Sequence, residues 1–265
     1  MTYSVNKRQS AGFLLCATAI CLGVLGTGAA SGAASLPGSL VPVYAIDFTG
    51  DTAGGQPAIE PYFDDKTSTR FEALDTGVDN GDALVVSDSL ADLSGRSLKF
   101  VEAGTGDFKP WVGANLPDIS SGTVRFSWNS AMVNIEPGKS RNLLTFWLYG
   151  TKGQEKDASL LVALSYAIDG SSTSFGLQGI GGQTGRGSWT LSKSDRFTVT
   201  VDMDAGTLTI KADDTTLVDR NLGGDRITSL TGFRFADASS IGGGDVQFTA
   251  GINNVVVVAT KSAIP

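Results

Sequence analysis

Residues 196–222 read RFTVTVDMDAGTLTIKADDTTLVDRNL, and this stretch decides the fold. Apolar and polar side chains alternate over 196–202 and again over 207–211. Strict alternation places every second side chain on one face, which is the pattern of a half-buried β-strand. Residues 203–206 (MDAG) separate the two runs, and Gly206 suits the positive φ of a tight turn. The stretch therefore predicts an antiparallel β-hairpin.

The same alternation recurs along most of the chain. Residues 124–129 (VRFSWN) show it most clearly, and further strands are predicted at 42–49, 83–88, 97–102, 110–116, 143–150, 159–167, 174–180, 215–221, 230–236 and 245–258. Glycine accounts for 34 of the 265 residues, nearly twice the usual share of about 7%. Aspartate outnumbers glutamate, and both biases favour tight turns over helices. The sequence predicts an all-β, antiparallel protein.

The first 34 residues have the three-part layout of a secretory signal peptide. Lys7 and Arg8 are positively charged, 11–26 is apolar, and small residues follow at 27–35. The apolar run is shorter than the ~20 residues of a membrane span. We therefore expect a cleaved signal rather than an uncleaved anchor, and no membrane insertion after cleavage. The mature protein is expected to be secreted to an extracellular, periplasmic or cell-surface location.

The residues that remain after residue 34 form one predicted domain. We expect a short linker at 35–40, a single β-sandwich domain at 41–258 and a tail at 259–265. This part of the chain contains no cysteine and no histidine, because Cys16 and Cys21 lie in the signal and the protein has no histidine. Thiol, histidine and zinc catalysis are therefore excluded. The net charge of −7 also argues against nucleic acid as a partner.

Three segments together resemble the concanavalin A-like and laminin G-like jelly-roll superfamily. They are the hairpin at 196–222, the first strand YAIDF at 44–48 and the closing segment GINNVVV at 251–257. The resemblance implies a two-sheet antiparallel jelly-roll β-sandwich in which the first and last strands pair. This fold is shared by lectins, glycosidases, lyases and adhesion modules, so it does not assign a function.

The resemblance also implies a structural Ca²⁺ ion. In many superfamily members, oxygens from the first strand, the loop after it and the last strand hold this ion. Asp47 and Asn253 correspond to such ligands, and calcium accepts 6–8 oxygen ligands of this kind. The alternative interpretation is that Asp47 and Asn253 are ordinary polar residues at strand ends.

The acidic residues do not match the catalytic motifs of related enzymes. Jelly-roll glycosidases of the laminarinase type carry Glu-x-Asp-x-Glu on one strand, because retaining hydrolysis needs two carboxyl groups about 5–5.5 Å apart. Here the nearest two glutamates, Glu60 and Glu72, are twelve positions apart. Asp202 and Asp204 lie at the hairpin turn, where we interpret them as turn caps. We therefore predict no catalytic residue.

Aromatic and polar side chains form the candidate binding site. Alternation in 143–149 (LLTFWLY) places Trp147 and Tyr149 together on the face away from the core. Flat rings stack on the C–H faces of sugars, while amide and guanidinium groups bind the hydroxyls. The further candidates are Trp111, Arg125, Asn129 and Gln178. The alternative is that loops cover this face and bury Trp147; Trp128 and Trp189 are assigned to the core and to a loop anchor.

Three functions remain open at this point. The first is a non-catalytic, lectin-like protein that binds a polysaccharide or other glycan, and the site residues favour it. The second is a structural or adhesion module of the cell surface, which needs only the fold. The third is a polysaccharide hydrolase or lyase with carboxylates outside the known motifs.

Overall fold

The computed structural model describes residues 39–55, 57, 72–74, 83–103, 111–136, 141–180, 187–237 and 246–260. The strands in these ranges are β1 (Leu40–Ile46), β2 (Glu72–Leu74), β3 (Ala83–Ser87), β4 (Ser97–Glu102), β5 (Trp111–Ile119), β6 (Thr123–Ile135), β7 (Arg141–Lys152), β8 (Ser159–Asp169), β9 (Ser172–Gly179), β10 (Ser194–Asp202), β11 (Thr207–Ala212), β12 (Thr215–Asn221), β13 (Ile227–Asp237) and β14 (Phe248–Thr260). A 3₁₀ helix, η2 (Gly223–Asp225), precedes β13. Within the same ranges, no helix has the length and apolar character needed to cross a bilayer.

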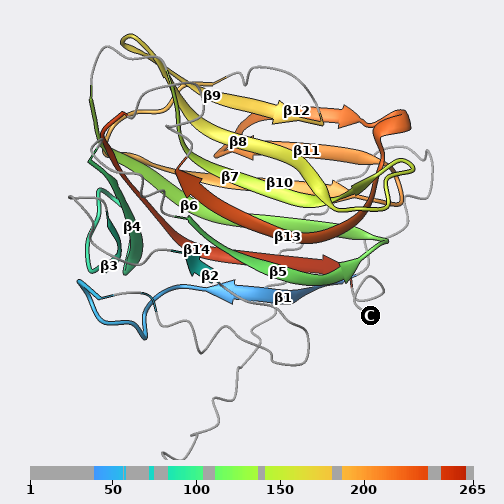
Figure 1. Ribbon diagram of the computed structural model, residues 1–265, viewed down its shortest axis with the longest axis horizontal. Helices are drawn as coiled ribbons and strands as arrows, with labels where there is room; N and C mark the ends of the chain where they lie inside the picture. The colour runs from blue at the N-terminus through green and yellow to red at the C-terminus, as the bar shows by residue number, and fades with distance from the viewer. Residues whose placement is uncertain are drawn as a thin grey trace, which may run out of the picture. The chain divides into compact units, whose positions relative to one another are not determined.

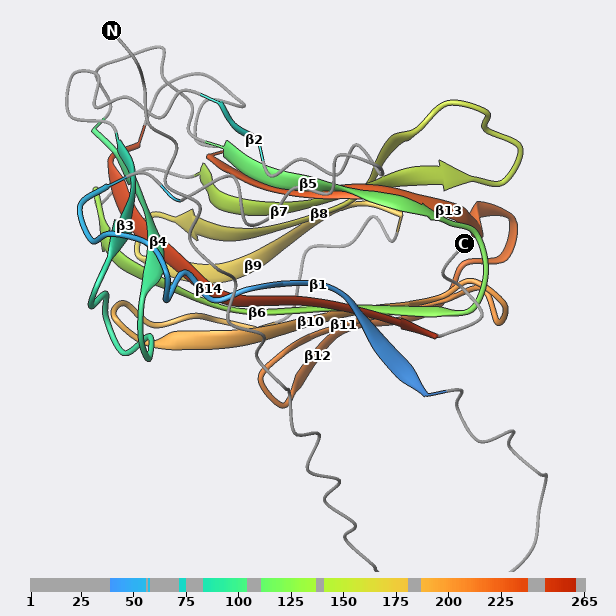
Figure 2. The ribbon, with the colours of Figure 1, turned by 90° about the horizontal axis from the view of Figure 1, so that it is seen from below.

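The strands form two antiparallel sheets that pack face to face (Figure 1 and Figure 2). The eight-stranded sheet has the order β12-β11-β10-β6-β14-β4-β3, and β1 also pairs with β14. The six-stranded sheet has the order β2-β5-β13-β7-β8-β9. In this second sheet β13 lies between β5 and β7, although β13 follows both by many residues in the sequence. This long-range pairing assembles the candidate site.

Aromatic side chains from both sheets meet in the core. Trp128 of β6 stacks on Phe146 of β7 with ring centroids 4.4 Å apart, and on Phe197 of β10 at 5.2 Å. The Tyr166 hydroxyl in β8 donates a hydrogen bond to the backbone oxygen of Ser130 in β6, at 2.9 Å. All of these side chains are buried. Alternate residues of each strand therefore build one core that joins the two sheets.

The structure confirms the predicted all-β, two-sheet antiparallel sandwich. The predicted hairpin is β10 and β11, which pair from Asp202 opposite Thr207, and Gly206 in the turn has a φ of 66°. The Oδ1 atom of Asp202 accepts a hydrogen bond from the Ala205 backbone N–H at 2.8 Å. This contact confirms that Asp202 caps the turn.

Two tryptophans have the structural roles assigned from the sequence. The Trp128 side chain is only 3% exposed and lies in the core. The Trp189 side chain is equally buried, and its indole N–H donates to the backbone oxygens of Ala167 and Ser174 at 3.0 and 2.9 Å. Trp189 therefore anchors its loop to β8 and β9.

Both ends of the domain carry more strand than the sequence predicts. Leu40, which we placed in the linker, pairs with Thr260, which we placed in the tail. At its other end β1 stops at Ile46, and Phe48 has a left-handed φ of 59°, which ends the extended conformation. Strand β2 is not predicted, because its three residues are too few to show alternation. The predicted signal peptide at 1–34 lies outside the described residues.

Candidate functional site

The outer face of the six-stranded sheet carries three neighbouring rows of cross-strand partners. Strand register places Trp111, Ala236, Thr145, Ser165 and Gly176 in the first row, Gly113, Arg234, Trp147, Ala163 and Gln178 in the second, and Asn115, Gly232 and Tyr149 in the third. Their strand neighbours Phe146, Phe233 and Phe235 point into the core. Because side chains alternate along a strand, the three rows face away from it.

Bulky side chains gather where β5, β13 and β7 meet. The guanidinium carbon of Arg234 lies 4.2 Å from the centroid of the Trp111 ring and 5.2 Å from that of the Tyr149 ring. The Trp147 and Tyr149 rings are 6.4 Å apart, with their planes at 80°. All four side chains are half-buried. We call these four residues the aromatic cluster, and cation–π attraction between Arg234 and two of its rings holds it in place.

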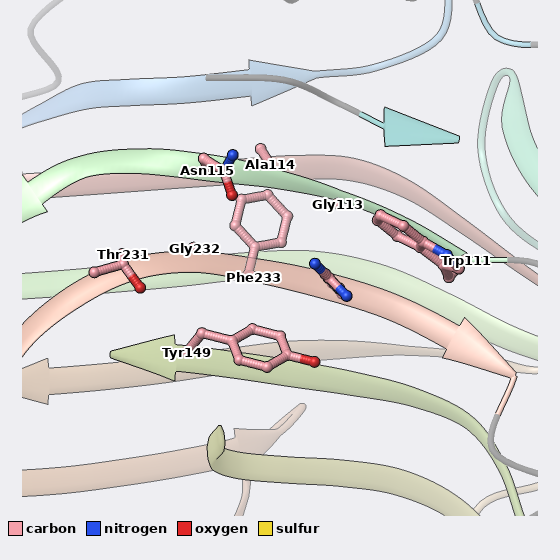
Figure 3. A pocket seen from close by; sticks show the side chains of 9 residues that line it. Trp111, Gly113, Ala114, Asn115, Tyr149, Thr231, Gly232 and Phe233 are labelled. Carbon is pink, nitrogen blue, oxygen red and sulfur yellow. The ribbon is translucent and has the colours of Figure 1, made fainter. Parts of the chain in front are cut away.

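A hollow of ≈ 190 Å³ lies beside the aromatic cluster. Figure 3 shows Trp111, Asn115 and Tyr149 around it, each from the outer face of its strand. Gly113 and Gly232 also line the hollow. A Cβ atom on Gly113 would lie 2.7 Å from the Cγ of Arg234, which is closer than real Cβ contacts. Glycine at 113 therefore allows the close approach of β13, including the stem of the Arg234 side chain.

The Tyr149 hydroxyl is suited to hydrogen bonding. Burial raises its pKa above the usual value, and the charge and hydrogen bond of Arg234 offset part of that increase. The hydroxyl is therefore protonated at neutral pH. The Arg234 guanidinium beside the Tyr149 ring can only donate hydrogen bonds, so it does not compete with a ligand for the hydroxyl hydrogen. A general base works best with a pKa near the operating pH, and the pKa of Tyr149 lies above that range.

The structure brings four of the predicted site residues to one face. Trp111, Trp147 and Tyr149 belong to the aromatic cluster, and the exposed Gln178 lies in the same row as Trp147 with Ala163 between them. The sequence left open whether the Trp147 side chain is exposed or buried under loops. In the structure it is half-buried. Whether these residues bind a ligand stays a prediction.

Arg125 and Asn129 do not join these four residues, which corrects the grouping made from the sequence. Both lie on β6 in the eight-stranded sheet, where Arg125 is opposite Thr200. Asn129 donates a hydrogen bond to the side-chain oxygen of Asn253 at 3.1 Å. Alternation shows which side chains share a face of one strand, but it does not show which sheet that strand joins.

Sequence reasoning missed Arg234 and Asn115. A signal for Arg234 was present, because it stands between Phe233 and Phe235 in an alternating strand. A charged residue flanked by two core aromatics must lie on the outer face. Asn115 lies four positions after Trp111 on the same strand, so alternation places both side chains on the same face. The neighbours of both residues depend on β13 pairing with β5 and β7, which local sequence does not reveal.

The residues that correspond to calcium ligands do not fit a calcium shell in this structure. The side-chain oxygen of Asn253 accepts hydrogen bonds from the amide groups of Asn129 and Asn254, and its own amide group donates to the Ser94 backbone oxygen. Asp47 accepts two hydrogen bonds from Thr49. Among the described residues, no group of three or more His, Cys, Asp or Glu side chains could hold a metal ion. The calcium site stays a prediction without support from these contacts.

An arginine from the segment between β3 and β4 contacts the loop that follows β1. The guanidinium of Arg96 donates to the backbone oxygens of Thr49, at 3.3 Å, and of Asp51. Its Nε atom lies 2.7 Å from a carboxylate oxygen of Asp88. Arg96 therefore brings a positive charge to backbone oxygens in the loop where the resemblance implies a cation.

Comparison with solved structures shows the same fold in proteins of very different sequence. A sialidase aligns with a TM-score of 0.52 and 12% identity, over 83% of this chain but only 19% of its own. A carbohydrate esterase from the Shiga toxin-encoding bacteriophage phi24B aligns at 0.50 and 9%, over 84% and 100%. The endo-β-1,4-glucuronan lyase of the fungus Trichoderma reesei aligns at 0.50 and 10%, over 84% and 98%. No protein-family model and no curated protein sequence matches this chain.

The chain is a two-sheet antiparallel β-sandwich whose fold is similar to that of these enzymes. Its distinguishing feature is the outer face of the six-stranded sheet, where the aromatic cluster borders a hollow.

Proposed function

We propose that this protein is a secreted, non-catalytic carbohydrate-binding protein. In this proposal a glycan lies along the outer face of the six-stranded sheet, in contact with the aromatic cluster. The observation that carries the proposal is that Trp111 and Tyr149 line the ≈ 190 Å³ hollow, with the Trp147 ring 6.4 Å from that of Tyr149. Secretion is inferred from the signal-like N-terminus.

The chemistry of this face matches a sugar ligand. A pyranose has apolar C–H faces, which gain from contact with aromatic rings, and a rim of hydroxyl groups. The Tyr149 hydroxyl and the exposed Asn115 amide line the hollow, and the Gln178 amide lies farther along the second row. Rings and polar groups side by side can therefore contact both parts of a sugar unit.

The structural neighbours support carbohydrate as the ligand class. Two of them, a carbohydrate esterase and a glucuronan lyase, are by name enzymes that act on carbohydrates. These enzymes leave open whether this chain binds a glycan or also cleaves it.

Glycan binding and its loss in a single variant test the proposal. We expect the purified protein to bind polysaccharides on an array, and Trp147→Ala to lower the affinity about tenfold, the usual size of a lost central aromatic contact. Asn115→Ala, at an exposed position of the hollow, is expected to weaken binding, and circular dichroism checks that the variant is folded. Arg125→Ala removes an exposed side chain from the opposite sheet and is the matched control.

Three results would contradict the proposal. One is the absence of binding to any glycan. Another is equal affinity for the native protein and both site variants, which would place the ligand elsewhere. Release of sugar fragments from a bound polysaccharide would show that the protein is an enzyme.

A further inference from the structure

Among the residues of the three rows whose side chains are described, Arg234 carries the only charge. Strand β2 extends the second row by Glu72, which lies opposite Gly113. It lies in the second row, between Gly113 of β5 and Trp147 of β7. A half-buried cation in the middle of a sheet face loses part of its hydration. The charge therefore needs compensation, either from the protein or from a ligand.

The described contacts of Arg234 are with rings and a neutral hydroxyl. They comprise the faces of Trp111 and Tyr149, and Tyr149 is a neutral phenol at pH 7. Among the carboxylates whose side chains are described, which do not include Glu72, none forms an ion pair with Arg234, whereas Arg96 has Asp88 at 2.7 Å. In a protein with a net charge of −7, a central arginine without such a pair is a specific feature of this face.

The ring contacts hold the guanidinium in a fixed orientation. Arginine is planar, and aromatic rings contact its face while its N–H groups point outward in the plane. A carboxylate can accept two parallel hydrogen bonds from such an edge. The hollow beside Arg234 is wide enough at ≈ 190 Å³ for a sugar carboxylate to approach.

We propose that the glycan is acidic and that Arg234 binds the carboxylate of a uronate unit while the aromatic cluster contacts the sugar ring. This inference rests on the proposed carbohydrate-binding function and specifies its ligand class. Neutral glycans lack the group that compensates Arg234, so they bind more weakly.

Glu72 is the one acidic residue that strand register adds to the second row. It occupies the position on β2 opposite Gly113, so a glycine position separates it from Arg234. If the Glu72 carboxylate neutralised Arg234, the native protein would show no preference for acidic glycans. The preference would then appear only in the Glu72→Gln variant. The proposal expects the preference in the native protein and the same preference in Glu72→Gln.

Matched glycan pairs test the inference directly. Alginate, polygalacturonate, glucuronan and hyaluronan are each compared with their methyl-esterified forms, which keep the backbone and lose the charge. We expect the native protein to bind at least one acidic form about tenfold more tightly than its ester, the range of a charge-assisted hydrogen-bonded pair. This difference should decrease with added salt.

Variants separate the charge from the stacking contacts. Arg234→Gln is expected to bind acid and ester equally, and Arg234→Lys to keep only part of the preference because lysine lacks the planar fork. Trp147→Ala should weaken both forms by the same factor. Arg125→Gln removes an exposed arginine from the other sheet and should keep the full preference. Circular dichroism and melting temperature confirm that each variant is folded.

Each outcome has a distinct meaning. Equal affinity of the native protein for acid and ester, or a preference that survives in Arg234→Gln, overturns the acidic-ligand inference and leaves carbohydrate binding intact. A preference for the acidic form that appears only in Glu72→Gln overturns the acidic-ligand inference for the native protein. Failure to bind any glycan, acidic or neutral, overturns the proposed function itself.

Discussion

Asp195 lies at the edge of the core in a position unfavourable for a charged carboxylate. The Tyr166 hydroxyl shares its hydrogen between the Ser130 backbone oxygen, at 2.9 Å, and the Oδ2 atom of Asp195, at 3.2 Å. Burial, followed by repulsion from Asp213 and Asp92, raises the pKa of Asp195 from 3.8 to about 6, although the Tyr166 hydrogen bond lowers it. The folded protein therefore binds this proton more tightly than the unfolded chain does. Stability from this group is present at low pH and is lost as pH rises through about 6.

Asp195→Asn is expected to raise the melting temperature at pH 7.5. Asparagine keeps an acceptor for Tyr166 and removes the buried charge. The gain over the native protein should shrink as the pH is lowered from 7 towards 4, because the native carboxyl then becomes neutral in the folded state. Thermal unfolding followed by circular dichroism across this range measures it. Asp157→Asn, at an exposed turn, is the control. An increase in melting temperature of Asp195→Asn that does not vary with pH would contradict the account.

Individual residues of the site were predictable where local alternation decides their direction. Trp147 and Tyr149 share a face because they are two positions apart on one strand. Arg125 and Asn129 share a face of β6 for the same reason, but β6 belongs to the other sheet. The distance between two strands depends on tertiary pairing, which the residues of neither strand encode alone.

At the scale of elements, the segment between β3 and β4 joins the loop after β1 to the last strand. Its Arg96 donates to the backbone oxygens of Thr49 and Asp51, and its Ser94 accepts from Asn253 of β14. These contacts involve backbone oxygens and one amide, which the spacing of residues in the sequence does not reveal. They place protein groups where the resemblance implies calcium.

Arg96→Ala is expected to destabilise the protein by about 1–3 kcal/mol, from the loss of charge-assisted hydrogen bonds to backbone oxygens. The pair with the exposed Asp88 adds little. In the native protein, EDTA and added Ca²⁺ should leave the melting temperature unchanged. Calorimetric unfolding with and without Ca²⁺ measures both effects. A melting temperature that falls with EDTA and recovers with Ca²⁺ would instead support the calcium site.

At the scale of the whole molecule, the two sheets are joined by the aromatic core. Trp128 contacts Phe146 across the sandwich and Phe197 within its own sheet. Alternation in many strands predicts this two-layer architecture, because each strand has one apolar face to bury. The order of strands in each sheet was not predictable, because it depends on contacts between segments far apart in the sequence.

Trp128→Ala is expected to destabilise the protein by about 3–5 kcal/mol, since it leaves a large cavity between the sheets. Urea unfolding measures the loss. Trp147→Ala, on the outer face, should cost clearly less, because the Trp147 side chain is only half-buried. Equal losses for the two variants would show that Trp147 is part of the core.

The central claim is that a glycan binds over the aromatic cluster. The four tryptophans of the chain provide a direct test, because Trp111 and Trp147 lie on the outer face whereas Trp128 and Trp189 are buried elsewhere. Their indole N–H signals can be followed by NMR during titration with a glycan that binds, after assignment by single Trp→Phe variants. The account predicts that the signals of Trp111 and Trp147 shift in a saturable way while those of Trp128 and Trp189 stay in place. Saturable binding that leaves the Trp111 and Trp147 signals unmoved would contradict it.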